Sequence, residues 1–396
     1  MASDRQYIRA GQALIGTELR QNVVLVVGAD GLIEAVLPES QCSQPCQDFR
    51  GCTLLPGMID THVHGAVGFD VMDASHEGLE AMSWFFAAKG VTAFVATTVT
   101  APVNKIKQVL LQVGKSKRKG LSGAALLGAY LEGPYFTPRH KGAHPEHLFR
   151  ELDTRELDSW ISYSDGSLLV VALAPEKVNA EKAIHHLSNC GVRVTLGHTD
   201  ATAEQVQAAF SAGADGLVHC YNGMSGLHHR GPGVVGAGLC QPDSYIEMIA
   251  DGHHVHPLAI DVAHRCCGER LMLITDAMRA AGMPDGEYML GEYQVEVSGG
   301  IARTKAGGLA GSTLTLIDAV KNLSAWLDMP FEQAWLSASL TPANFLGIAD
   351  RYGSLEVGKK ASMVAVTDSK QIQNTWVDGN MVYAADKTTL SEAVCI

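Results

Sequence analysis

The sequence lacks paired-cysteine motifs and long apolar runs. None of its nine cysteines has Cys-x-x-Cys spacing, and Cys266 and Cys267 are adjacent, a poor geometry for a disulfide. An odd number of scattered cysteines indicates free thiols in a reducing compartment. The N-terminal stretch MASDRQYIRA has no apolar signal core. No run reaches the roughly 18 to 20 apolar residues of a membrane span. We therefore expect a soluble cytoplasmic protein without a membrane partner.

Basic charge is also scarce. Thirty lysines and arginines face 42 aspartates and glutamates, which gives a formal net charge of -12. The one dense basic stretch, GKSKRKG at 114–120, is typical of a solvated helix end or loop. This balance argues against a nucleic-acid partner. An anionic small molecule is still compatible with it, because one local cationic pocket is enough.

The middle of the chain alternates between two patterns. Apolar, strand-like runs stand at 91–99, 125–133, 168–175, 192–198, 216–221, 245–252 and 270–277. Segments with helical periodicity, such as 78–90 and 202–214, separate them. Continuous apolar strands that alternate with helices indicate a parallel sheet buried on both faces. About eight such units fit an α/β fold of the (β/α)8 TIM-like barrel type.

The two ends of the chain have a different pattern. The first 55 residues contain short strands and turns, with an expected hairpin at 22–38, and the last 40 residues are similar. We predict that residues 1–55 and 354–396 build one small β-sandwich domain. Residues 56–353 would then form the barrel.

One stretch, LLPGMIDTHVHG at 54–65, places two histidines at the end of an apolar run. In a strand, residues two apart point to the same side, so His62 and His64 present two imidazoles together. That arrangement suits a metal. Taken alone, however, the pair is equally compatible with structural histidines.

Other strand-like runs also end in polar residues: Glu132, His198, His219 and Asp276. In a TIM-like barrel, the carboxyl ends of the strands meet at the mouth, where active sites lie. Each residue has a structural alternative, such as a helix cap at Asp276. Together they favour a hydrolytic divalent-metal site, because charged groups rarely end buried strands repeatedly unless they are paired or bind metal.

These motifs carry a family resemblance. PGMIDTHVHG resembles the first metal motif of the amidohydrolase superfamily. The segments LEGPYF, KGAH, LGHTDA, HCYNGM, ADGHHV, ITDAM and GGLAGSTLTLIDAV extend the resemblance to the N-acetylglucosamine-6-phosphate deacetylases, over nearly the whole chain. The resemblance implies hydrolysis of N-acetyl-D-glucosamine 6-phosphate to glucosamine 6-phosphate and acetate, in amino-sugar metabolism.

The resemblance also implies a role for each site residue. Glu132, His198 and His219 would hold the main catalytic metal, and His62, His64 and Asp276 a second one bridged by Glu132. One or two divalent metals per chain follow, with zinc the leading candidate and iron, cobalt or manganese left open. Such a metal lowers the pKa of water from about 15.7 to about 7. Asp276 would act as general base and then acid, and His144 would bind the acetamide oxygen and stabilise its developing charge.

The same resemblance assigns the residues that bind the phosphate of the substrate. Asn222, the Gly223 backbone N–H and His254 would bind it, together with Arg230 of a neighbouring subunit, which implies a homodimer. Guanidinium–phosphate pairing is charge-assisted and can be bidentate. The alternative for Arg230 is a solvated basic loop.

Three other functions stay open at this point. One is deacetylation of a related acetamido sugar such as the galacto epimer. Another is hydrolysis of a cyclic amide, against which Glu132 argues because many such enzymes have a carboxylated lysine there. The third is a catalytically inactive scaffold, against which the complete set of candidate ligands argues.

Overall fold

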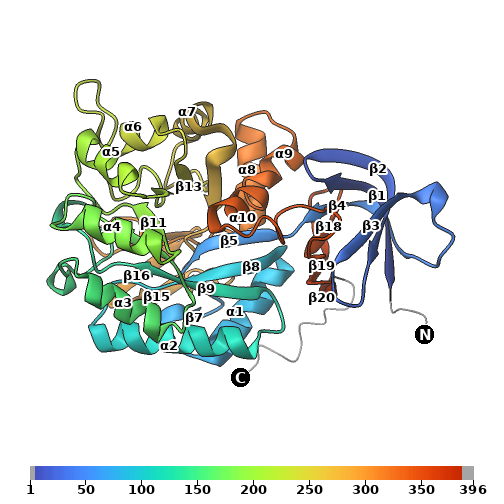
Figure 1. Ribbon diagram of the computed structural model, residues 1–396, viewed down its shortest axis with the longest axis horizontal. Helices are drawn as coiled ribbons and strands as arrows, with labels where there is room; N and C mark the ends of the chain where they lie inside the picture. Colours follow the sequence, from blue (N-terminus) through green and yellow to red (C-terminus); the bar gives the residue numbers. More distant parts are fainter. Residues whose placement is uncertain (1–4, 386–396) are drawn as a thin grey trace.

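In the computed structural model, which describes residues 5–385, eight parallel strands form a barrel (Figure 1). Their order is β5 (Met58–Val63), β8 (Val91–Thr97), β9 (Ala125–Glu132), β10 (Leu168–Leu173), β11 (Arg193–Leu196), β12 (Gly216–Leu217), β13 (Tyr245–Ile249) and β14 (Leu271–Ile274). Every neighbouring pair in this order is parallel. The predicted (β/α)8 barrel is confirmed.

The barrel closes beside the histidine pair. The Asp276 N–H donates to the His62 carbonyl at 3.0 Å, and the His64 N–H donates to the Ala277 carbonyl at 2.8 Å. These bonds join the end of β5 to the segment after β14, so the first and last strands meet at the mouth. Closure therefore brings Asp276 next to both histidines.

Helices cover the outside of the barrel. They are α1 (His76–Ala88), α2 (Val103–Lys119), α3 (Thr154–Tyr163), α4 (Ala180–Asn189), α5 (Ala203–Ser211), α6 (Gly233–Cys240), α7 (Pro257–Cys267) and α8 (Leu316–Trp326), followed by α9 (Phe331–Leu336) and α10 (Leu340–Leu346). Side-chain capping fixes where a helix begins: a capping box of Thr202 and Gln205 marks the start of α5. All seven residues of β8 are buried, as expected of a strand covered on both faces. The basic stretch ends α2, where its charges suit the helix dipole.

The two chain ends share one sheet, to the right of the barrel in Figure 1. Its strands run in the order β20 (Asn380–Ala384), β19 (Ile372–Val377), β18 (Met363–Thr367), β4 (Gln47–Pro56), β1 (Gln6–Ile15), β2 (Glu18–Val27) and β3 (Ile33–Pro38). The join is the antiparallel pair of β4 and β18. Ile8, Leu25, Met363 and Trp376 belong to one buried core, so both ends enclose it together.

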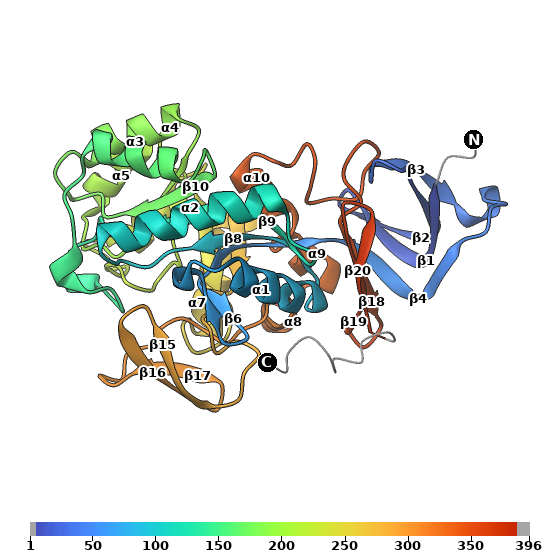
Figure 2. The ribbon, with the colours of Figure 1, turned by 90° about the horizontal axis from the view of Figure 1, so that it is seen from below.

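One element was not expected from the sequence. After β14 the chain forms a three-stranded sheet of β15 (Gly286–Leu290), β16 (Tyr293–Ser298) and β17 (Ile301–Thr304), which lies beside the barrel in Figure 2. Within residues 5–385, every helix is too short or too polar to cross a membrane. None of the eight cysteines in that range is in a disulfide.

Candidate metal centre and active site

Six side chains singled out in the sequence meet at the mouth of the barrel. They are Glu132, His198, His219, His62, His64 and Asp276, which we call the six-residue cluster. Glu132 Oε1 lies 3.0 Å from His219 Nε2 and 3.3 Å from His198 Nε2, and the two nitrogens are 3.1 Å apart. Tetrahedral zinc ligands, about 2.0 to 2.1 Å from the ion, stand about 3.3 Å from one another. This triangle, the first position, therefore has the spacing of a metal site.

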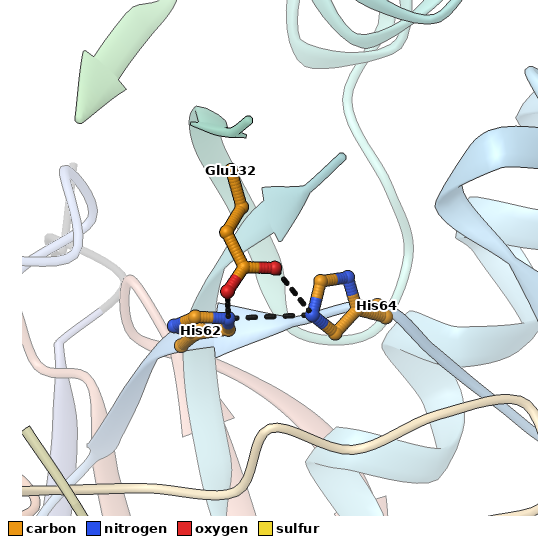
Figure 3. A group of neighbouring side chains, drawn as sticks. All are labelled: His62, His64 and Glu132. Carbon is orange, nitrogen blue, oxygen red and sulfur yellow. Dashed lines mark hydrogen bonds and ion pairs between the residues drawn. The ribbon is translucent and has the colours of Figure 1, made fainter. Parts of the chain in front are cut away.

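The second position consists of His62, His64 and Asp276. The Nε2 atoms of the two histidines are 3.3 Å apart. Asp276 Oδ1 lies 3.0 Å from His64 Nε2 and 3.6 Å from His62 Nε2. Figure 3 shows Glu132 reaching both histidines. Its Oε2 lies 3.2 Å from His64 Nε2, whereas Oε1 belongs to the first position. One carboxylate thus contacts both positions, as a bridging ligand must.

Backbone strain accompanies three of these residues. His198, His219 and Asp276 have φ angles of +47°, +27° and +50°. Non-glycine residues rarely adopt this left-handed region, and such conformations cost on the order of 1–3 kcal/mol each. All three follow their barrel strands by two residues, where this turn directs the side chain into the mouth. The fold thus maintains strained backbone at the positions that supply candidate ligands.

The electrostatics of the cluster favour a cation. Burial would raise the pKa of Glu132, but the charge of His62 and hydrogen bonds from His198 and His219 hold it well below its usual value. Burial lowers the pKa of His64, yet its bonds to Asp276 and Glu132 raise it to about 9. The carboxylates of the cluster therefore stabilise positive charge beside them.

The donor set fits a metal. Glu132, Asp276 and a third carboxylate, Glu247, are buried here, and within residues 5–385 none of them pairs with lysine or arginine. Their partners are histidines, and buried carboxylate charge is strongly unfavourable unless it is compensated. Imidazole and carboxylate donors suit zinc, iron, cobalt or manganese. These donors could therefore hold a divalent metal at either position.

His144 stands at the edge of the cluster as a neutral donor. Its Nδ1 accepts from the Thr100 backbone N–H at 3.3 Å and lies 2.8 Å from Thr100 Oγ1. Because the backbone N–H must donate, the proton of His144 lies on Nε2, 3.6 Å from Glu132 Oε2. Burial and the charge of His198 hold the pKa of His144 well below its usual value. The imidazole therefore offers an N–H towards the mouth without carrying charge.

Asn222 and Gly223 lie directly against the first position. The Asn222 carbonyl oxygen is 3.1 Å from His219 Nδ1. Gly223 has a φ of +62°, and a Cβ there would come within 2.9 Å of His198 Nδ1. Glycine is required at this position for both reasons.

His254 and Arg230 are in different surroundings. The His254 side chain is buried, with Nδ1 2.6 Å from Asp251 Oδ2, which leaves Nε2 available. Arg230 is exposed, and its guanidinium contacts His229 at 2.7 Å. Among residues 5–385, it forms no hydrogen bond or ion pair with the six-residue cluster. Among the described residues, His144, Asn222 and Gly223 therefore lie against the six-residue cluster. Within this part of the chain, His254 and Arg230 form no hydrogen bond or ion pair with it.

Sequence reasoning missed Glu247, Thr100 and Asp251. Glu247 binds His62, Thr100 orients His144, and Asp251 orients His254. The detectable signal was the charge of Glu247 within the apolar run YIEMI, since an acidic residue is seldom fully buried without a partner. Thr100 gave no comparable signal.

Comparison with known proteins decides the family. Residues 53–382 match the Amidohydrolase family. The chain belongs to this family. This amidohydrolase is 60% identical, over 98% of both chains, to the N-acetylglucosamine-6-phosphate deacetylase of Vibrio furnissii. It is 50% identical to the N-acetylgalactosamine-6-phosphate deacetylase of Escherichia coli O157:H7, over 89% of this chain and 93% of that one.

A solved structure is similar over the whole fold. A mutant of the N-acetyl-D-glucosamine-6-phosphate deacetylase of Mycobacterium smegmatis, in complex with N-acetyl-D-glucosamine-6-phosphate, superposes with a TM-score of 0.90. The similarity covers 96% of this amidohydrolase and 100% of that chain, at 32% identity.

Proposed function

We propose that this amidohydrolase removes the acetyl group from N-acetyl-D-glucosamine 6-phosphate, giving glucosamine 6-phosphate and acetate. The observation that carries the proposal is the six-residue cluster at the barrel mouth, with two three-residue sets of donors that share Glu132. The relatives named for this reaction support the choice of substrate.

Each residue then has a chemical task. A divalent metal, when bound, activates water and polarises the acetamide carbonyl. Asp276, the most exposed carboxylate of the cluster with 11% of its side chain accessible, accepts the proton of the attacking water and returns it to the leaving amine. The His144 Nε2–H donates to the acetamide oxygen as negative charge develops there.

The phosphate contacts form the second part of the proposal. The Gly223 backbone N–H has no hydrogen-bond partner within residues 5–385, and Asn222 precedes it in the chain. The Nδ1–H of His254 is directed at Asp251, so its Nε2 donates to the phosphate as the imidazolium. Arg230, on its exposed loop, acts from a second subunit, so the working unit is a homodimer. Guanidinium–phosphate bonds are well suited to such a shared site.

Zinc is the leading metal, with iron, cobalt and manganese as alternatives. Residues 56–353 form the catalytic unit and residues 1–55 and 354–396 the accessory unit, of which 1–4 and 386–396 lie outside the described residues. Free thiols are compatible with a cytoplasmic location.

The test is acetate release from four sugars: N-acetylglucosamine and N-acetylgalactosamine, each with and without a 6-phosphate. The proposal requires the 6-phosphate gluco sugar to have the highest kcat/KM and both unphosphorylated sugars to be poor. Equal rates with and without phosphate would refute the phosphate contacts. Release of no acetate from any sugar, with metal bound, would refute the substrate class.

A second candidate is deacetylation of the galacto epimer. The relative from Escherichia coli O157:H7, named for that activity, is 50% identical to this chain. The same assay separates the two candidates. A higher kcat/KM for N-acetylgalactosamine 6-phosphate than for the gluco sugar would make the galacto sugar the substrate. The metal-centre chemistry is common to both.

A further inference from the structure

Glu247 is a buried carboxylate that the proposed reaction does not use. It lies in β13 with 1% of its surface exposed. Its Oε2 lies 3.0 Å from His62 Nδ1 and 3.3 Å from the His219 backbone N–H. Its other oxygen, Oε1, has no hydrogen-bond partner within residues 5–385. A carboxylate buried in this way is unfavourable unless it has a specific task.

The four histidines of the cluster are oriented in two different ways. For His64, His198 and His219, Nδ1 faces a backbone carbonyl, at 3.3, 2.9 and 3.1 Å. Of the four, His62 alone has a carboxylate, that of Glu247, against its Nδ1. A neutral carbonyl fixes the ring, whereas a carboxylate also increases the basicity of the imidazole as a ligand.

The bond to Glu247 decides which nitrogen of His62 can bind metal. An ionised carboxylate only accepts, so His62 Nδ1 must carry the proton. Its Nε2 then has a free lone pair, directed at His64 Nε2 and Asp276 Oδ1, 3.3 and 3.6 Å away. With the other tautomer, His62 would present an N–H to the second position and could not act as a ligand.

Building on the proposed metal-dependent function, we propose that Glu247 is a positioning residue that controls binding of a second divalent metal. Its carboxylate contacts the ring of His62, whereas at His219 it contacts only the backbone N–H. The first position, formed by Glu132, His198 and His219, has its own carbonyl-oriented histidines. Loss of the Glu247 carboxylate should therefore weaken one metal position and leave the other in place.

The chain offers a matched control in Asp60. This carboxylate is also buried, and it lies on the same strand as His62. Its oxygens accept from the Thr275 hydroxyl at 2.6 Å and from the backbone N–H groups of Thr275 and His62, at 3.3 and 3.4 Å. It forms no bond with the His62 ring. The Asp60→Asn variant thus removes a nearby buried carboxylate but keeps the tautomer of His62.

The experiment measures metal binding, independently of activity. The wild type, Glu247→Gln, Asp60→Asn, His62→Gln and the double variant His62→Gln/Glu247→Gln are stripped with a chelator. Each is titrated with zinc by calorimetry, zinc per chain is determined after dialysis, and thermal unfolding confirms folding. We expect two zinc ions in the wild type and in Asp60→Asn. In Glu247→Gln, the affinity for the second ion should fall about 10- to 100-fold, while the first stays.

The double variant tests whether Glu247 acts through His62. His62→Gln should lose the second ion, and adding Glu247→Gln should change nothing further, because the two residues form one unit. Two ions bound with wild-type affinity in Glu247→Gln would overturn the proposal. So would an equal loss in Asp60→Asn, an additive loss in the double variant, or a wild type that binds a single ion. A wild type that binds none of zinc, iron and cobalt when each is titrated in turn would instead refute the proposed function itself.

Discussion

His144 allows the sharpest prediction about catalysis. Its Nε2–H is a single, neutral donor at the mouth, fixed from behind by Thr100, and only 4% of the residue is exposed. A donor of this kind contributes mainly when negative charge develops on the acetamide oxygen. Removal of one such donor typically costs about 2.7–4 kcal/mol, or about 10²- to 10³-fold in kcat.

We therefore expect His144→Ala to lower kcat about 100- to 1000-fold with N-acetyl-D-glucosamine 6-phosphate. KM should change far less, because the bond strengthens only in the transition state. Metal content should stay at the wild-type value, since His144 belongs to neither metal position in this account. Initial rates of acetate release over a range of substrate concentrations measure both constants.

A second variant, at Thr100, should lower kcat by a smaller factor. Thr100→Val removes the hydroxyl beside His144 Nδ1 but keeps the backbone N–H that fixes the tautomer. One neutral hydrogen bond contributes about 0.5–1.5 kcal/mol, so kcat should fall only about 2- to 13-fold. An unchanged kcat in His144→Ala, or a loss confined to KM, would refute the assigned role. A loss of metal in that variant would make His144 a ligand instead.

Three further predictions follow from the site and the core. Asp276→Asn should lower kcat about 10²- to 10⁴-fold, while elemental analysis should still find the metal of the first position. Wild-type kcat in this variant would rule out a role of Asp276 in proton transfer. His254→Ala should lower kcat/KM about 10- to 150-fold for the phosphorylated sugar, because a hydrogen bond to a charged group contributes about 1.5–3 kcal/mol. An equal loss of kcat/KM for the unphosphorylated sugar would contradict the phosphate contact. Trp376→Ala, in the core shared by the chain ends, should lower the free energy of unfolding in urea by about 3–5 kcal/mol; a change below about 1 kcal/mol would mean that this core contributes little to stability.

Much of the barrel was predictable because its physics is local and repetitive. Each buried strand is a continuous apolar run, as in 91–99, and a (β/α)8 barrel brings the carboxyl ends of all its strands to one mouth. Polar residues at those ends, such as Glu132 and His198, could therefore be grouped although they are 66 positions apart. The shared sheet of the two chain ends was recognised from turn-rich strands at both termini.

The rest depends on contacts that carry no sequence pattern. The bond between Glu247 and His62 joins residues 185 positions apart in the interior of the barrel. The tautomer of His144 follows from a backbone N–H at Thr100, which any residue type would supply. The sheet of β15, β16 and β17 interrupts the alternation of strands and helices, so periodicity alone could not place it.

The central claim is that metal held by the six-residue cluster drives deacetylation of a phosphorylated amino sugar. The most direct measurement is acetate release from N-acetyl-D-glucosamine 6-phosphate by chelator-stripped protein, before and after stepwise addition of zinc, iron or cobalt. The account predicts no release from the stripped protein and recovery as the metal at the first position is restored. Full activity in protein verified to be free of metal would contradict it.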